Sequence, residues 1–134
     1  MNRLYINQWF QNHGGRFPVL VAELNGNLLG WGSLNQFNPR KAYNGVADLS
    51  VYIKREFRGK DIGKSLLKEL EILAIQHGFY KIVLSTFPFN RLGQSLYERV
   101  GYRVVGTYKN QGILDGEFVD VMIMEKFLVK KINN

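Results

Sequence analysis

Residues 55–65 carry the clearest chemical pattern in the sequence, a basic loop with two glycines followed by an apolar helical repeat. The cations are Arg55, Arg58, Lys60 and Lys64, and the glycines are Gly59 and Gly63. A glycine-bearing turn before a helix leaves backbone N–H groups unpaired at one spot, where the helix dipole adds partial positive charge. Such a spot binds phosphate, and arginine can hold a phosphate with two hydrogen bonds. The pattern therefore predicts a pyrophosphate-binding loop.

Two other glycine-loop motifs do not fit this stretch. The dinucleotide fingerprint needs a third glycine and an acidic residue about 20 positions further on. The Walker motif ends in Gly-Lys-Ser or Gly-Lys-Thr, which residues 63–65 provide, but it also needs a glycine at position 58, where an arginine stands. An ordinary turn before an amphipathic helix remains the alternative, because short glycine motifs are weak evidence on their own.

The composition limits the classes of protein to consider. The chain has 134 residues, which suits one domain over residues 1–134, and 46% of them are hydrophobic. It has no cysteine and only two histidines, His13 and His77, so we expect no metal site. No apolar run is long enough to cross a membrane, and the first residues lack the pattern of a secretory signal. We therefore expect a cytoplasmic protein without a membrane partner.

The net charge of +7 predicts an anionic partner. That partner is either a nucleic acid or a phosphorylated small molecule. No arrangement of aromatic and basic residues matches a known nucleic-acid reader. We therefore expect no nucleic-acid partner, and the charge favours the phosphorylated ligand that the loop predicts.

The hydrophobic periodicity predicts strands and helices on both sides of the loop. Expected are a short helix at 4–10, strands at 18–24, 28–37, 46–53, 81–85, 102–108 and 118–126, a helix from 62 that closes at His77-Gly78, a helix at 90–100, and a turn-rich loop at 110–116. The turn Asn25-Gly26-Asn27 predicts a hairpin, so the first three strands form a meander. The strand at 81–85 is parallel to the third if the helix is a crossover. The sum is a mixed α/β sheet, with the loop at a strand end where open α/β sheets bind ligands.

At this point the sequence resembles a known family. The run Arg58-x-x-Asp61-x-Gly63 resembles the acetyl-CoA pyrophosphate loop, Arg/Gln-x-x-Gly-x-Gly/Ala, of the GNAT acetyltransferase superfamily. Further matching features follow in order: Leu20–Glu23, Ala42-Tyr43, Val51–Ile53, Gly78-Phe79, Asn90, Leu96–Glu98, Gly101-Tyr102 and Asp120-Val121. The resemblance is closest to the phosphinothricin N-acetyltransferase group. It implies the GNAT fold, a mixed and mostly antiparallel central sheet flanked by helices.

The resemblance also implies roles for individual residues. The backbone of residues 51–53 should pair with the pantetheine arm of acetyl-CoA, and N–H groups of residues 59–64 should hold its pyrophosphate. Asn90 should bind the cofactor near its thiol end. The implied cofactor-binding residues are Val51, Tyr52, Ile53, Arg58, Gly59, Lys60, Asp61, Ile62, Gly63, Lys64, Ser65 and Asn90. Tyr97 falls where family members place the general acid for the departing thiolate, and Asp48 where relatives have a glutamate acting as general base.

Each of these side chains also has a structural interpretation. Asp48 could be a solvent-facing strand residue, although strands disfavour aspartate. Tyr97 is one position from the apolar stripe of Leu92 and Leu96 and could simply pack there. Asn90 is a natural helix N-cap, and a cap can also contact a ligand.

The sequence departs from the family in three places. Asp61 replaces a usual glycine, which predicts weaker cofactor affinity. Val119 stands where the phosphinothricin group has a histidine. Relatives carry a further strand and helix, on the order of 40 residues, before the point where this chain begins. We therefore expect that strand and helix to be absent and the strand Pro18–Leu24 to be an exposed sheet edge, which predicts a homodimer.

The leading hypothesis is an N-acetyltransferase with acetyl-CoA as cosubstrate. The acceptor is the primary amine of an amino acid or an amino-acid-like toxin such as phosphinothricin, which attacks the thioester directly in a ternary complex. The alternatives are a non-catalytic acyl-CoA-binding domain, suggested by Asp61 and the short start, and an enzyme that acetylates a peptide or protein amine. A nucleic-acid-binding module is suggested by the charge alone.

Overall fold

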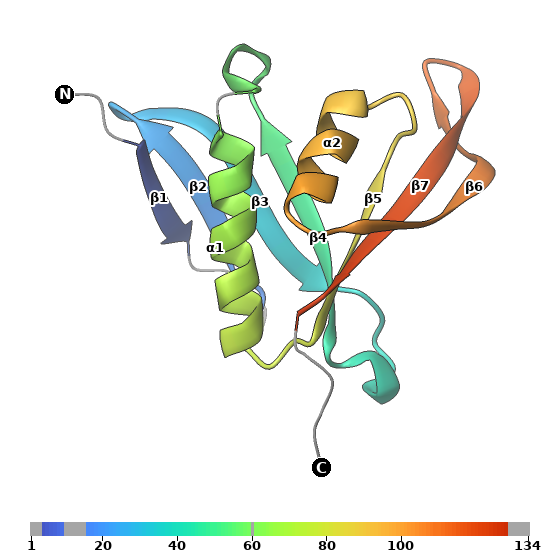
Figure 1. The fold of residues 1–134 in the computed structure, drawn as a ribbon, viewed down its shortest axis with the longest axis horizontal. Helices are drawn as coiled ribbons and strands as arrows, with labels where there is room; N and C mark the ends of the chain where they lie inside the picture. Colours follow the sequence, from blue (N-terminus) through green and yellow to red (C-terminus); the bar gives the residue numbers. More distant parts are fainter. Residues whose placement is uncertain (1–3, 10–15, 60, 129–134) are drawn as a thin grey trace.

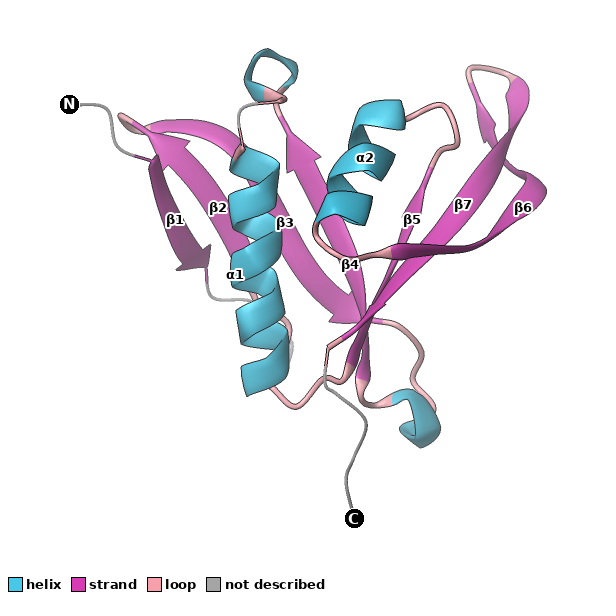
Figure 2. Cartoon of the chain, in the orientation of Figure 1, coloured by secondary structure: helices cyan, strands magenta, loops and turns pink. Residues whose placement is uncertain are grey.

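The computed structural model describes residues 4–9, 16–59 and 61–128 and shows one mixed sheet with two α-helices (Figures 1 and 2). The strands are β1 (Leu4–Trp9), β2 (Val19–Leu24), β3 (Asn27–Gln36), β4 (Val46–Ile53), β5 (Lys81–Thr86), β6 (Arg103–Leu114) and β7 (Glu117–Phe127). The helices are α1 (Ile62–Gln76) and α2 (Arg91–Arg99), with short 3-10 turns at Lys41–Tyr43 and Arg55–Phe57. The seven strands lie in the order β1-β2-β3-β4-β5-β7-β6.

The predicted meander and crossover are confirmed. β2, β3 and β4 pair antiparallel in succession, and β5 pairs parallel to β4 after α1. The hairpin between β2 and β3 turns at Asn25 and Gly26, whose φ angles of 52° and 80° suit a type I′ turn. Asparagine and glycine adopt positive φ at little cost, so this local signal was reliable.

The core lies between the sheet and α1. Leu66, Leu70 and Ala74 recur on one face of the helix and are fully buried. A Cβ on Gly32 of β3 would lie 2.7 Å from the side chain of Leu70, so glycine lets the helix approach the strand closely. Both helices lie on the same face of the sheet (Figure 1).

The helix predicted for residues 4–10 is wrong. Residues 4–9 form β1, which pairs antiparallel with β2, and Ile6 packs against the core opposite Ala22. The pairing with β2 decides the structure of this segment and overrides the apolar side that suggested a helix. A strand therefore does precede β2, and the segment Pro18–Leu24 is not a sheet edge. Phe10 and the predicted helix end at 13–15 lie outside the described residues.

Two further details differ from the sequence predictions. Residues 110–114, expected in a loop, belong to β6, and the chain turns at Asp115 and Gly116. The turn signals there mark an irregularity in the strand: Asn110 has a φ of 52° and donates its N–H to the Asp120 carboxylate at 2.8 Å. Leu92, expected on the buried face of the second helix, is 71% exposed.

Candidate active site

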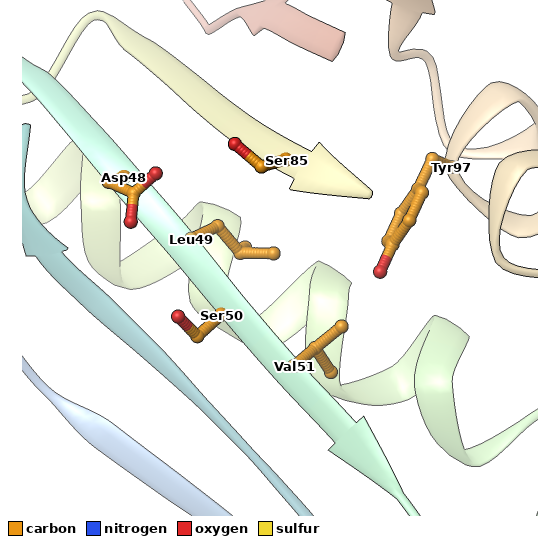
Figure 3. A pocket seen from close by; sticks show the side chains of 6 residues that line it. All are labelled: Asp48, Leu49, Ser50, Val51, Ser85 and Tyr97. Carbon is orange, nitrogen blue, oxygen red and sulfur yellow. The ribbon is translucent and has the colours of Figure 1, made fainter. Parts of the chain in front are cut away.

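A pocket opens where β4 and β5 separate. The two parallel strands pair only over residues 46–49 and 81–84, although β4 continues to Ile53 and β5 to Thr86. The gap holds a cavity of about 250 Å³. Its lining residues, shown in Figure 3, are Asp48, Leu49, Ser50, Val51, Ser85 and Tyr97. Because β5 diverges from β4, backbone groups and side chains at the end of β4 are exposed that would be covered if the two strands paired along their full length.

The register of β4 shows which backbone groups face the gap. The N–H of Lys54 donates to the carbonyl of Leu29 at 2.8 Å. Because hydrogen-bonded and non-bonded pairs alternate in an antiparallel ladder, even-numbered residues of β4 bond to β3. Val51 and Ile53 therefore direct their backbone groups toward the gap. The Ile53 carbonyl accepts from Arg58 Nε at 3.1 Å, so a ligand strand would meet the Val51 groups first.

Side chains of β4 alternate between the two faces of the sheet. Val51 is paired with Gly32, which faces α1, so odd-numbered residues point to the helix side. Asp48 and Ser50 therefore lie on the opposite face. The Asp48 side chain is half-buried, and burial raises the pKa of its carboxyl, while a hydrogen bond from the Asn35 side chain opposes that rise. Asp48 thus presents a carboxylate whose proton affinity is increased, as a general base requires.

Tyr97 approaches the same gap from α2. It is 7% exposed, packs edge-on against Tyr102 with ring centroids 6.0 Å apart, and directs its hydroxyl toward Leu49 and Val51 (Figure 3). Burial raises the pKa of the Tyr97 phenol, so the hydroxyl keeps its proton over a wider pH range. Packing and the predicted acid role are compatible, since the ring is buried while the hydroxyl lines the pocket.

Asn90 has the structural role that the sequence allowed. Its Oδ1 accepts from the Gly93 N–H at 3.1 Å, which caps α2, and its Nδ2 donates to Thr86 Oγ1 at 3.1 Å. An amide nitrogen carries two hydrogens, so Nδ2 retains one donor for a ligand. Binding of the cofactor by Asn90 stays a prediction.

The glycine loop has the backbone that its sequence suggested. Gly59 has a φ of 77°, and Asp61, the N-cap of α1, has a left-handed φ of 65°. Within the described part of the chain, the Asp61 side chain makes no capping hydrogen bond, so it leaves the first amides of α1 to other acceptors. Lys60 lies outside the described residues.

The predicted cofactor-binding residues of this region differ in burial and in hydrogen bonding. Ile62 is 5% exposed and belongs to the core. A Cβ on Gly63 would lie 2.7 Å from the Leu96 side chain, so this glycine also lets α1 and α2 touch. Tyr52 is exposed, and by the alternation of β4 its side chain lies on the face away from α1. The Ser65 N–H donates to the Asp61 carbonyl at 3.0 Å. This backbone N–H is therefore used within the helix and is not one of the unpaired amides at its N-terminus.

A second, basic hollow lies between α1 and the C-terminal end of α2. Its volume is about 520 Å³, and its lining residues are Lys64, Leu67, Lys68, Glu71, Arg99, Val100, Gly101 and Lys126. Lys126 joins its walls, because its Nζ contacts Glu71 Oε1 at 2.5 Å and the Val100 carbonyl at 2.6 Å. Lys64 lies in the first turn of α1, directly after the glycine loop, and also lines this hollow.

Sequence reasoning missed three polar residues at or beside the pocket. Ser50 and Ser85 line it, and Asn35 faces Asp48 from β3. No local pattern identifies them, because their position depends on strand register and on the divergence of β5. Among the described residues, no group of three or more histidine, aspartate or glutamate side chains could hold a metal ion. None of the helices in that part of the chain is long and apolar enough to span a bilayer.

This geometry and sequence match known proteins. A family model described as "Acetyltransferase (GNAT) family" matches residues 1–102. YwnH of Bacillus subtilis (strain 168) is 34% identical over 122 residues, which are 90% of this chain and 75% of YwnH. The L-methionine sulfoximine/L-methionine sulfone acetyltransferase of Pseudomonas aeruginosa is 29% identical over 119 residues, 87% of this chain and 69% of that protein. A GNAT superfamily phosphinothricin acetyltransferase from Sinorhizobium meliloti, solved in complex with AcCoA, has a TM-score of 0.78 at 29% identity, covering 84% of this chain and 61% of that one.

Proposed function

The chain belongs to the acetyltransferase (GNAT) family, and we propose that it transfers an acetyl group from acetyl-CoA to the primary amine of a small, amino-acid-like molecule. The observation that carries the proposal is the pocket between β4 and β5, which has a half-buried carboxylate on one side and a buried tyrosine hydroxyl on the other. These are the two groups that can take a proton from an attacking amine and give a proton to a departing thiolate. No covalent intermediate on the protein is needed for this chemistry.

The described residues offer acetyl-CoA a complementary surface. Val51 presents backbone groups to the gap, which suits pairing with an extended amide-containing arm. At the end of β4, the first amides of α1 and the cations Arg55, Arg58 and Lys64 suit a pyrophosphate. When bound, acetyl-CoA supplies the activated acetyl group as a thioester.

Asp48 and Tyr97 would divide the proton transfers between them. A primary amine arrives as ammonium, and the Asp48 carboxylate takes its proton through a water molecule. The Val51 N–H donates to the oxygen of the attacked carbonyl as negative charge develops there. The C–S bond then breaks as the Tyr97 hydroxyl delivers a proton to the departing sulfur, and the second proton lost by the nitrogen restores that hydroxyl. Because the two groups lie on opposite faces of the gap, amine and thioester approach from opposite sides.

The names of the relatives support an amino-acid-like acceptor. One acts on methionine sulfoximine and methionine sulfone, and another is named for phosphinothricin. Val119, which replaces the histidine of the phosphinothricin group, lies on β7 opposite Gly112. We therefore propose the wider class, α-amino acids with a tetrahedral polar group on the side chain, and not phosphinothricin alone.

A thiol-release assay with acetyl-CoA and a panel of amines tests the proposal. The panel contains methionine sulfoximine, methionine sulfone, phosphinothricin, common amino acids and a lysine-containing peptide, and mass spectrometry identifies the acetylated product. Turnover with the sulfoximine or phosphinothricin supports the proposal, and turnover with the peptide alone overturns the acceptor class. Thermal stabilisation by acetyl-CoA without any turnover would favour the non-catalytic acyl-CoA-binding domain, which the left-handed Asp61 in the loop suggests.

We also propose a single cytoplasmic domain over residues 1–134 that forms a homodimer. The exposed edge expected at β2 does not exist, because β1 pairs with it. The support for a dimer comes instead from the other edge of the sheet. The edge strand β6 and its partner β7 expose apolar side chains at Val105, Ile113 and Phe118, a pattern typical of contact surfaces. Light scattering at micromolar concentration is expected to give twice the chain mass, and a monomer would count against the dimer.

A further inference from the structure

Asn35 holds a central place among the polar side chains next to the pocket. It is paired with Asp48 in the β3–β4 register and lies on the same face of the sheet. Its Nδ2 donates to Ser50 Oγ at 3.1 Å and lies 3.4 Å from the Asp48 backbone carbonyl. The side chain therefore contacts two of the residues that line the pocket.

A further hydrogen bond fixes the orientation of this amide. Ser33 Oγ donates to Asn35 Oδ1 at 3.2 Å, and Ser33 is only 6% exposed. With its oxygen held by Ser33, the amide must turn its NH₂ group toward β4. The same side chain interacts with the Asp48 carboxyl and opposes the rise in its pKa that burial causes. Asn35 thus favours the ionised form of Asp48.

Few other titratable groups lie where they could influence the ionisation of Asp48. Titratable groups on the elements around Asp48 are Tyr97 across the pocket, Tyr52 along β4, and Glu125 on β7. Glu125 lies beyond Val83 in the sheet and is ion-paired with Lys81 and Arg103. Burial raises the pKa of the Tyr97 phenol and so favours its neutral form, and Glu125 is compensated by its two cations. Asn35 is therefore the polar neighbour best placed to control Asp48.

We propose that Asn35 is a positioning residue of the acetyl transfer: held by Ser33, its amide fixes Asp48 and Ser50 on the acceptor side of the pocket. The inference rests on the proposed function, since it assigns Asn35 to act through Asp48. The sheet itself does not require this side chain, because backbone pairs join β3 to β4 on both sides of it. Its hydrogen bonds lead to pocket residues and to Ser33, and it is not part of the hydrophobic core.

The first test compares Asn35→Ala with Gln36→Ala, a change at the neighbouring exposed residue of the same strand. We expect Asn35→Ala to lower kcat/KM for the amine about 10-fold, a part of the roughly 10²–10⁴-fold that a positioned base contributes. The KM for acetyl-CoA stays unchanged, and the acid limb of the pH–rate profile moves to higher pH. Gln36→Ala should behave as wild type. An acid limb that stays in place in Asn35→Ala overturns the proposal.

A second variant separates loss of the hydrogen bond from misfolding of Asn35→Ala. Asn35→Asp keeps the shape of the side chain but cannot donate when ionised and adds a like charge beside Asp48. We expect its acid limb to move further than that of Asn35→Ala, because a like charge disfavours ionisation. In an Asp48→Asn background, Asn35→Ala should cause no further loss of rate, since residues that act as a unit are not additive. Additive losses would contradict the proposal.

A measurement independent of turnover separates this inference from the proposed function. The Asp48 carboxyl can be titrated by carbon NMR, with its resonance assigned from Asp48→Asn. The Asp48 pKa should be higher in Asn35→Ala than in wild type or Gln36→Ala. If no amine is acetylated but this rise occurs, the proposed function fails and the Asn35–Asp48 coupling stands. If the pKa does not change, the coupling is wrong even in an active enzyme.

Discussion

The β4 wall of the pocket and the α2 wall hold their titratable groups in different surroundings. On β4, Asp48 is half-buried within a hydrogen-bonded row formed with Ser33, Asn35 and Ser50. On α2, Tyr97 is buried among apolar residues and Tyr102, and burial alone raises its pKa. Polar neighbours keep one group ionisable, while apolar neighbours keep the other protonated. Two groups whose surroundings separate their proton affinities in this way are suited to act as base and acid.

Removal of the β4 group should have the largest effect. We expect Asp48→Ala to lower turnover at neutral pH by roughly 10²–10⁴-fold, because no other carboxylate lines the pocket in the described structure. The dissociation constant for acetyl-CoA, measured by calorimetry, should change little. Unchanged turnover would remove Asp48 from the chemistry and leave the β4 wall as a binding surface.

Removal of the α2 hydroxyl should cost less. Tyr97→Phe keeps the ring packed against Tyr102 and should lower turnover by roughly 10²-fold, the lower end of the range for general acid catalysis. The melting temperature should stay within a few degrees of wild type, since the ring supplies the buried area. Full activity would mean that the tyrosine only packs.

The pH–rate profile tests both walls together. The base must be ionised, so the rate should fall as pH drops through the raised pKa of Asp48, above the ordinary aspartate value of about 3.9. The acid must be protonated, so any alkaline fall caused by Tyr97 should lie above the ordinary tyrosine value of about 10. An acid limb below the ordinary aspartate value would show that burial does not control Asp48.

A change outside both walls should have the smallest effect. Asp61→Gly relieves a left-handed backbone and removes a negative charge from the predicted phosphate loop, so the KM for acetyl-CoA should fall several-fold. Folding stability should rise by less than about 1 kcal/mol. Both limbs of the pH–rate profile should stay in place. A displaced limb would mean that the loop and the pocket walls are not independent.

The sequence predicted those parts of the fold that local signals determine. Asn25-Gly26 marked its hairpin, and the apolar period of α1 marked both the helix and its buried face. Residues 4–9 were misassigned because six residues with a weak period gain their structure from pairing with β2. Leu92 was misassigned because periodicity cannot show that the first turn of α2 extends beyond the core, so that Tyr97 is the buried residue of that helix.

The site was predictable only in part for the same reason. Asp48 and Tyr97 came from the family resemblance, and the structure brings both to one pocket. Their catalytic roles and the contacts of the cofactor residues stay predictions. Ser85 had no signal because it reaches the pocket through the divergence of β5, and Asn35 had none because it meets Asp48 and Ser50 through the register of β3 on β4.

The close approach of Gly63 and Leu96 links the predicted phosphate loop to the helix that carries Tyr97. Gly63 lies beside the predicted phosphate site, and Leu96 precedes the tyrosine of the pocket on the same helix. A larger residue at position 63 would require the Leu96 side chain to shift, because an added Cβ would lie 2.7 Å from it. A larger residue at position 63 should therefore be tolerated better when position 96 carries a smaller side chain, which leaves room for the added atoms.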